Sequence, residues 1–447
     1  MIGRLFAAAG IALAAAVPAP AHADVPATAQ AELPMALPAP ATATEDAEPG
    51  LPVRVDDLDI EGLWRTHPDL VRGELPWTPG QVVDEAPWAL GLARLWNTGL
   101  FSKVSARRVR MPGGRVVARL HLEERWTINL LFSFQAAAQR AAASSAWWSA
   151  GLSDLNLGGR YVEAAASFEQ FDQFHGGQAF VRAHRFMGRR MDAMAQWEWL
   201  VRPRVGFGDR RMRVRLESNH LAWDDQVRVG GRLDLQEDAL FDVSGIGTAL
   251  PSSSRSALVD LGARIGRIDI VRVRQSGASL EVRPAVGLAT AGDGPAPFAQ
   301  LWAQGLWYAL AGPRWNLAAR GQLGVQSAAP PQLRYFLGGL SEVRGVRDSY
   351  LQVDRFGLGN VEARYTAFDS TWLAVVPTAF VDGAVARDAA RGWTVLASTG
   401  VGVRLLVPRF VRTGLRIDAA VPMAGIACAA GAGGVCPGLS AGVFQFF

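Results

Sequence analysis

Hydrophobic and polar residues alternate along most of the chain, from about residue 126 to the C-terminus. Similar alternation recurs around residues 193–201, 259–265 and 315–323. A period of two residues is typical of β-strands that bury one face. The segment 227–236 shows the pattern, with Val227, Val229, Leu233 and Leu235 on one face and Arg228, Arg232, Asp234 and Gln236 on the other.

The mixed charges on the second face cannot lie in hydrocarbon, so they are expected to line a polar lumen. Counting the alternating segments gives about sixteen strands, an even number that permits a closed antiparallel barrel without exposed edges. The sequence therefore predicts an all-β transmembrane barrel at 126–447, preceded by one small α+β domain. A pair of soluble β-sandwiches is the alternative, and the many tryptophans on the outward register count against it.

Composition supports a barrel over a helical membrane protein. Hydrophobic residues make up 49% of the chain, with 15 Trp, 20 Phe and 48 Gly, and they are dispersed rather than gathered into blocks. Beyond the first residues no run of about 18 apolar residues occurs, which excludes spanning helices.

The first residues indicate export. Arg4, the apolar run 5–17 and the small-x-small ending Ala21-His22-Ala23 predict a signal peptide at 1–23. An uncleaved anchor is the alternative. Residues 24–50 are rich in Ala and Pro and predict a linker without a core.

A compact domain is expected at 51–125, in the order β-α-α-β-β. A strand is predicted over 53–60, a short helix over 68–75, and a second helix that Asp84 caps and Trp88 and Leu92 anchor. Two strands at 104–109 and 116–122, joined by a Pro-Gly-Gly turn, complete a hairpin.

Charge and candidate chemistry exclude several classes. The net charge of +4 comes from arginines spread along the chain, so a nucleic-acid partner is not expected. The histidines are scattered, and no metal, cofactor or catalytic residue is predicted. Gly438-Leu439-Ser440-Ala441-Gly442 fits a nucleophile elbow, but that elbow needs a following helix and this segment opens a terminal strand. Cys428 and Cys436 predict a disulfide in an exported chain, with metal binding the weaker alternative.

The segment 51–125 resembles a POTRA domain, the polypeptide-transport-associated module. The resemblance rests on Ile60-Glu61-Gly62-Leu63 with Arg65-Thr66, on Leu95 and 99–104, and on Glu124-Arg125. The sequence predicts only one such domain, whereas BamA has several and TamA has three.

The barrel resembles the BamA/TamA superfamily, whose members insert or translocate polypeptides at outer membranes. The matching motifs, in order, are Gly151-Leu152 through Gly159, Phe336 to Gly339 with Val343 to Val346, Gly359 to Arg364, Phe380 to Gly383, Gly400 to Arg404 and Arg416 to Asp418. The resemblance implies a loop that folds into the lumen and carries Gly338, Gly339, Val343, Arg344 and Gly345.

The strand count and the strand parity both bear on that loop. Eleven strands precede Tyr335, which places the Arg344 loop on the extracellular side. The apolar outward positions of the next two strands leave Glu362 and Asp382 facing the lumen. Because a planar guanidinium binds two carboxylates at once, Arg344 is expected to latch the loop to these two residues. The alternative is an ordinary ion pair among many in the lumen.

The chain ends with Phe444, Phe446 and Phe447, which resemble the β-signal that assembly machinery recognises. An aromatic girdle at the membrane interface is a second interpretation.

The predicted function is polypeptide handling by a monomeric barrel that lies in outer-membrane lipid, with its POTRA domain in the periplasm. An extended client is expected to add a strand along Val104, Ser105, Ala106, Arg107, Arg108 and Val109. Two alternatives remain, a passive pore or anchor that docks a periplasmic partner, and a dedicated transporter of one secreted protein.

Overall fold

The computed structural model describes residues 48–137, 145–171, 174–203, 207–223, 226–241, 253–290, 294–327, 329–339, 341–346, 349–388, 392–409, 414–425 and 438–443. No helix in these ranges is long and apolar enough to cross a membrane. The predicted signal peptide, most of the predicted linker, both cysteines and the three C-terminal phenylalanines lie outside these ranges.

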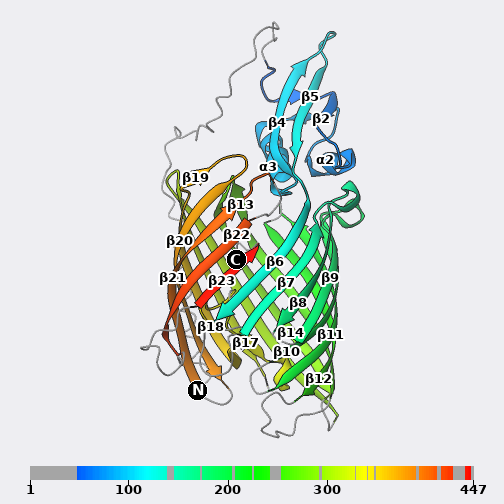
Figure 1. The fold of residues 1–447 in the computed structure, drawn as a ribbon. Coiled ribbons are helices and arrows are strands. Elements are labelled where there is room, and N and C mark those ends of the chain that lie inside the picture. The colour runs from blue at the N-terminus through cyan, green and yellow to red at the C-terminus, as the bar shows by residue number, and fades with distance from the viewer. Residues whose placement is uncertain are drawn as a thin grey trace, which may run out of the picture. The chain divides into compact units, whose positions relative to one another are not determined.

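An α+β domain precedes the barrel (Figure 1). Its three-stranded sheet has the order β2-β5-β4, in which β2 runs parallel to β5 and β4 runs antiparallel to it. The strands β1 and β3 form a separate two-stranded antiparallel sheet. The elements are β1 Val53–Arg54, β2 Asp57–Glu61, α2 Pro68–Glu74, β3 Val82–Val83, α3 Glu85–Asn97, β4 Phe101–Arg110 and β5 Val116–Glu124.

The prediction of a single strand at 53–60 is wrong, because this segment pairs with two different strands along its length. Val55 is fully buried, and its N–H donates to the carbonyl of Gln81 at 3.0 Å. The N–H of Asp56 donates instead to the carbonyl of Val116 at 2.8 Å. The segment therefore divides into β1, which pairs with β3, and β2, which pairs with β5.

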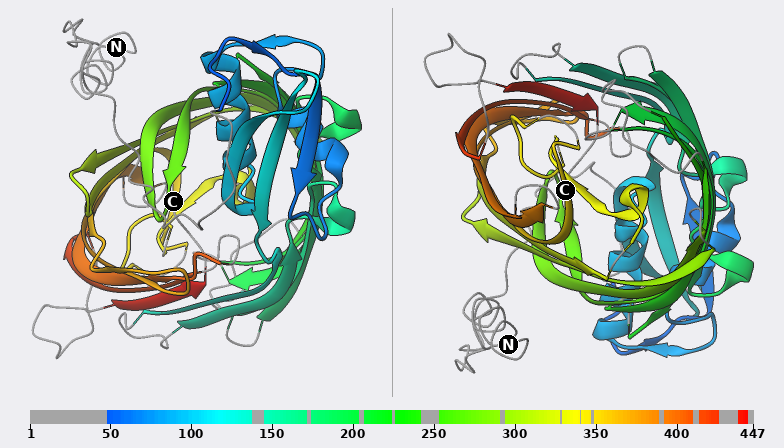
Figure 2. Two further views of the ribbon diagram at one scale, coloured as in Figure 1. Left: turned by 90° about the horizontal axis from the view of Figure 1, so that it is seen from above. Right: turned by 90° about the horizontal axis from the view of Figure 1, so that it is seen from below.

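Within the described ranges, sixteen long strands close into an antiparallel barrel, as the alternation predicts, and β23 pairs with β6 (Figures 1 and 2). Two short strands, β17 Tyr335–Leu337 and β19 Phe368–Asp369, extend the sheet beside β18 and β20. The long strands are β6 Ile128–Ala137, β7 Ser145–Asp154, β8 Val162–Phe171, β9 Phe174–Ala183, β10 Met191–Pro203, β11 Gly208–Ala222, β12 Val227–Phe241, β13 Ser254–Val271, β14 Arg274–Thr290, β15 Pro295–Ala311, β16 Trp315–Gln326, β18 Leu351–Tyr365, β20 Ala374–Asp388, β21 Gly392–Leu406, β22 Gly414–Ala424 and β23 Gly438–Val443.

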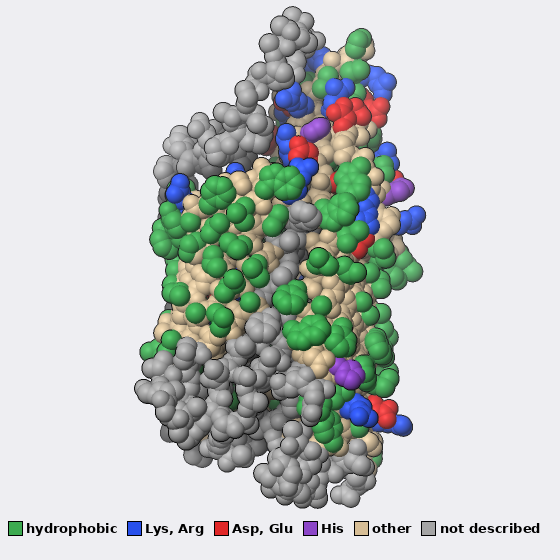
Figure 3. Space-filling model, viewed as in Figure 1, with side chains coloured by type: hydrophobic (Ala, Val, Ile, Leu, Met, Phe, Trp, Pro, Cys, Tyr) green, Lys and Arg blue, Asp and Glu red, His purple; other side chains and the backbone are tan. Residues whose placement is uncertain are grey.

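The two faces of the barrel wall differ as the sequence pattern predicts. Large apolar side chains such as Leu130, Leu261 and Val286 are exposed on the outside. Figure 3 shows hydrophobic side chains spread over the visible outer wall. Inward positions carry buried charges, among them Asp234 and Asp260. The wall therefore presents an apolar exterior and a charged interior.

Arg65 links the α+β domain to the start of the barrel, and a carboxylate at the end of β5 holds its backbone. We call the end of the barrel at which β6 begins the proximal end, and the opposite end the distal end. Glu124 accepts hydrogen bonds from the N–H groups of Arg65 at 3.1 Å and Thr66 at 2.8 Å. Arg65 in turn donates to Thr127 Oγ1 at 2.7 Å and forms an ion pair with Asp154 on β7. These contacts involve Arg65, Thr66 and Glu124, three of the residues noted in the sequence.

Helix α3 contacts the barrel at two separated places on the proximal end. Tyr161 Oη donates to the carbonyl of Thr98 at 3.0 Å, just past the end of α3. On another part of the wall, Trp96 Nε1 donates to the carbonyl of Ile270 at 3.0 Å. The core of the α+β domain also takes in Leu155 and Tyr161 from the turn after β7. The domain and the barrel thus share part of one hydrophobic core.

A buried ion pair also holds α2 to the barrel, and breaking it is expected to loosen the domain. Glu74 is fully buried and accepts from Arg185 at 2.6 and 2.9 Å. Replacing Glu74 with alanine should cost about 2 kcal/mol of docking free energy, because Arg185 loses its carboxylate in a largely desolvated place. Hydrogen exchange of α2 should rise. The exposed ion pair of Asp69 and Arg72 provides the control, and Asp69→Ala should leave that exchange unchanged.

Candidate functional site

The connection between β16 and β18, the eleventh and twelfth long strands, folds back inside the barrel. It includes the short helix η3 Pro331–Leu333 and strand β17. Figure 2 shows this segment, in yellow, within the ring of strands from both ends. Leu337, Val343 and Val346 are almost completely buried in a cluster with side chains of β18, β20 and β21. The loop is therefore packed into the barrel interior, in the place expected for it.

The tip of this loop is a tight turn that presents Arg344. The N–H of Gly339 donates to the carbonyl of Val346 at 3.0 Å, and the N–H of Val346 donates to that of Val343 at 3.3 Å. Gly338 and Gly339 both have positive φ angles, 129° and 101°. The backbone thus closes on itself and holds Arg344 at its apex.

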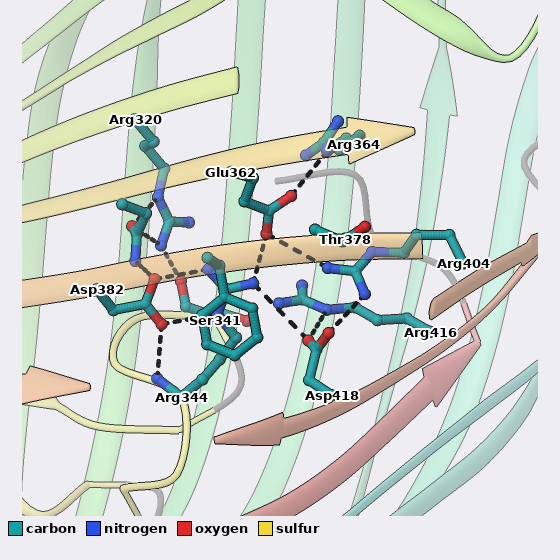
Figure 4. A network of polar contacts seen from close by, with 12 residues as sticks. Arg320, Ser341, Arg344, Glu362, Arg364, Thr378, Asp382, Arg404, Arg416 and Asp418 are labelled. Carbon is teal, nitrogen blue, oxygen red and sulfur yellow. Dashed lines mark hydrogen bonds and ion pairs between the residues drawn. The ribbon is translucent and has the colours of Figure 1, made fainter. Parts of the chain in front are cut away.

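Arg344 is bound to two carboxylates of the inner wall (Figure 4). Its Nε and Nη2 donate to the two oxygens of Asp382 on β20, at 2.7 and 2.6 Å. Its backbone N–H adds a third hydrogen bond to Asp382 at 3.0 Å, and its Nη1 donates to Glu362 on β18. The guanidinium carbon lies 3.5 Å from the ring centroid of Phe380. The side chain is 1% exposed, so these groups replace its hydration.

Three further arginines complete the partners of the inner-wall carboxylates. Arg364 Nε donates to Glu362 at 2.7 Å, and Arg404 reaches Glu362 at 3.3 Å. Arg404 also donates to Asp418 at 2.6 Å, and Arg416 donates to the other oxygen of Asp418 at 2.5 Å. These arginines lie on β18, β21 and β22, and Asp382 lies on β20, so the network ties four strands together around the loop.

An asparagine fixes the backbone of the same loop. Asn360 Nδ2 donates to the carbonyl of Glu342 at 2.7 Å and to Asp382 at 2.8 Å. Its oxygen accepts from Arg320 Nε on β16 at 2.8 Å. Arg320 also donates to the carbonyl of Ser341. The loop is consequently held through its main chain as well as through Arg344.

The arrangement suits a conformational clamp rather than bond-making chemistry. Glu362, Asp382 and Asp418 are at most 1% exposed, and each is engaged by at least one arginine. Buried charges of this kind are tolerated only while they remain paired, so the loop and the wall hold each other in place. Among the residues that the structure describes, no group of three His, Cys, Asp or Glu side chains could hold a metal ion.

The loop tip also lies against the last two strands. An added Cβ at Gly345 would sit 2.9 Å from Cβ of Ala420 on β22. An added Cβ at Gly438, the first residue of β23, would sit 2.6 Å from Cα of Gly345. Gly438 itself pairs with Ala137 of β6 across the closing seam. The clamp is thus in contact with the strand that closes the barrel.

The structure brings together Arg344, Glu362 and Asp382, which the sequence singles out. It places Val104 to Val109 within β4, at the edge of the α+β sheet. The segment 438–443 is strand β23, and Ser440 is buried in it. Sequence reasoning missed Asn360, Arg364, Arg404, Arg416 and Asp418 as members of the site. The strand parity that placed Glu362 inward also places Asn360 and Arg364 inward, because all three lie on β18 at alternate positions.

Comparison with known proteins shows the fold. No family model matches the sequence, and no curated protein matches it. Among solved structures, BamA from Haemophilus ducreyi lacking POTRA domains 1–3 is 14% identical, with a TM-score of 0.55 over 88% of this chain and 85% of that one. CdiB from Escherichia coli is 14% identical, with a TM-score of 0.61 over 88% and 77%. CdiB from Acinetobacter baumannii is also 14% identical, with a TM-score of 0.58 over 87% of this chain and 74% of that one. The expected barrel fold is confirmed.

Proposed function

We propose that this chain, whose fold is that of BamA and CdiB, handles polypeptides at the bacterial outer membrane, by inserting them or by translocating them. The observation that carries the proposal is the loop clamped by Arg344 inside a sixteen-stranded barrel. Paired buried charges tie this loop to the wall and hold the barrel in one arrangement. A client-handling barrel needs a defined closed state from which it departs, and the clamp supplies that state.

The proposed arrangement in the cell follows from the two parts of the chain. Residues 1–23 act as the signal peptide, and the α+β domain is a POTRA domain that lies in the periplasm. The barrel at 126–447 spans the outer membrane, with its proximal end toward the periplasm. The apolar outer wall and the charged lumen support this placement.

The edge strand β4 is the proposed docking place for a client. It pairs with β5 on one side, and no other described strand pairs with its second side. The N–H of Arg108 points away from β5, because it donates to the side chain of Glu48 at 3.0 Å. Strand alternation gives Val104 and Ala106 the same orientation. An extended polypeptide could therefore add a strand here through main-chain hydrogen bonds.

Photo-crosslinking in living cells tests the proposal. A photoreactive residue in place of Arg107, which is exposed on β4, should form adducts with newly exported polypeptides. The same residue in place of Arg72, on the exposed side of α2, is the control and should give few such adducts. Adducts with many nascent barrel proteins favour assembly, and adducts with one secreted protein favour dedicated translocation. Adducts with resident periplasmic proteins alone, or none, would favour the pore or anchor.

A proline at position 108 separates strand addition from side-chain binding. Proline lacks an N–H, and this N–H does not belong to the β4–β5 ladder, so the sheet should persist. Arg108→Pro should lower the crosslinking yield at position 107 several-fold, whereas Arg108→Ala, which keeps the N–H, should not. Equal loss in both variants would show that the client binds the arginine side chain rather than the strand edge.

A further inference from the structure

A polar cavity lies at the proximal end of the barrel, apart from the Arg344 clamp. It has a volume of about 200 Å³ and shares no residue with the clamp. One side comes from α3 and the other from the proximal ends of the strands between β8 and β13. Its lining includes Arg94, Asn97, Tyr161, His184, Arg228 and Arg264.

Two other arginines that line the cavity are compensated by carboxylates. Arg185 binds both oxygens of Glu74, as described above. Arg267 lies 2.8 Å from an oxygen of Asp269. Neither arginine therefore leaves the cavity with excess charge.

The pair Arg228 and Arg264 is not compensated in this way. The two residues lie directly opposite each other in the β12–β13 register, where like charges are destabilising. Arg228 approaches Asp192 only to 3.5 Å, and the other oxygen of Asp192 already accepts from Asn219 at 2.8 Å. Asp192 thus gives Arg228 only a long contact, and Arg264 lies opposite Arg228 on the next strand.

Arg264 has no hydrogen bond or ion pair within the described ranges of the chain. The carboxylate opposite it on β14 is Glu281. That carboxylate is engaged elsewhere, because it accepts from Arg283 Nε at 2.5 Å. Arg264 is only partly exposed and lines the cavity with its donors unused.

From this geometry we propose that the cavity is a binding site for an anionic oxygen group, a phosphate or a carboxylate, held between Arg228 and Arg264. Guanidinium forks bind such groups through paired hydrogen bonds, and an anion here offsets the repulsion between the two arginines. The volume accommodates a headgroup or a side chain but not a folded segment. The site stands on its own contacts and does not depend on the proposed function.

Titration calorimetry of the purified full-length chain in phosphate-free detergent, with inorganic phosphate as the probe, tests the site. Saturable binding is expected in the wild type. Arg264→Gln should weaken it about tenfold or more, since one of two charged forks is lost. Asp192→Asn should strengthen it, because the competing carboxylate is neutralised.

Arg255→Gln is the matched control, because Arg255 lies on the same strand, is 78% exposed and is absent from the cavity lining. It should bind phosphate as the wild type does. Heat-modifiable migration on gels checks that each variant is folded. Competition by acetate would assign the site to oxyanion groups in general, and competition by phosphomonoesters alone would assign it to phosphate. Absence of saturable binding, or equal binding in folded Arg264→Gln, would overturn the proposal.

Discussion

Replacing Arg344 with alanine is expected to lower the free energy of unfolding by about 3–5 kcal/mol, because it breaks a buried ion pair. Most of this free-energy cost should come from Asp382, because its buried charge would lose its partner. That carboxylate is fully buried, and Arg344 is the only arginine among the described residues that hydrogen-bonds to it. Glu362, by contrast, keeps Arg364 and Arg404 when Arg344 is removed.

A double-variant cycle separates the buried charge from the lost packing. In the Arg344→Ala background, Asp382→Asn removes the charge that has lost its partner, so it should cost little or restore stability. In the wild-type background the same change should be strongly destabilising. The two substitutions should therefore be far from additive, as contacting residues in one network are. Urea unfolding in lipid vesicles measures each corner of the cycle.

Arg387→Ala provides the control for this cycle. Arg387 lies on β20, the strand of Asp382, but its side chain is 48% exposed and 3.7 Å from Asp354. An exposed ion pair of this kind should contribute less than about 1 kcal/mol. Additive effects of Arg344→Ala and Asp382→Asn, or a loss in Arg344→Ala no larger than in Arg387→Ala, would refute the clamp.

The parts of this molecule that sequence could predict are those governed by local periodicity. A period of two fixes which side chains share a face, so the strand count and the inward direction of Glu362 and Asp382 follow from the pattern. The prediction of one strand at 53–60 was wrong because alternation of apolar and polar residues does not show where a strand changes its pairing partner. Val55 and Asp56 bond to segments far along the chain, at Gln81 and Val116.

The remaining members of the site depend on how the strands are staggered around the barrel. Many inward arginines and carboxylates alternate along the chain, and parity does not say which ones meet. Register and shear decide that Arg404 on β21 reaches both Glu362 on β18 and Asp418 on β22. The same staggering sets Arg228 opposite Arg264, while Glu281, the carboxylate opposite Arg264 on β14, binds Arg283. Neither of these contacts can be predicted from the local sequence pattern.

The second large effect is expected at Gly345, where backbone conformation and wall contact act together. Its φ angle is +79°, a region that a β-branched residue rarely adopts. A Cβ there would also press against Ala420 of β22. Gly345→Val should cost about 2–5 kcal/mol, the sum of backbone strain and overpacking, and should weaken the hydrogen bond from Arg344 N–H to Asp382.

Two other glycines separate these contributions. Gly312, in the turn after β15, has a φ of +83° and open space around its Cβ position, so Gly312→Val should cost only the strain, about 1–2 kcal/mol. Gly438→Ala adds a Cβ 2.6 Å from Cα of Gly345 without a positive φ, so it should report the contact between the loop and β23. Hydrogen exchange of β23 should rise in Gly345→Val and Gly438→Ala but not in Gly312→Val. If it stays unchanged in all three, the loop does not support the closing strand, and the clamp stabilises only its own position in the lumen.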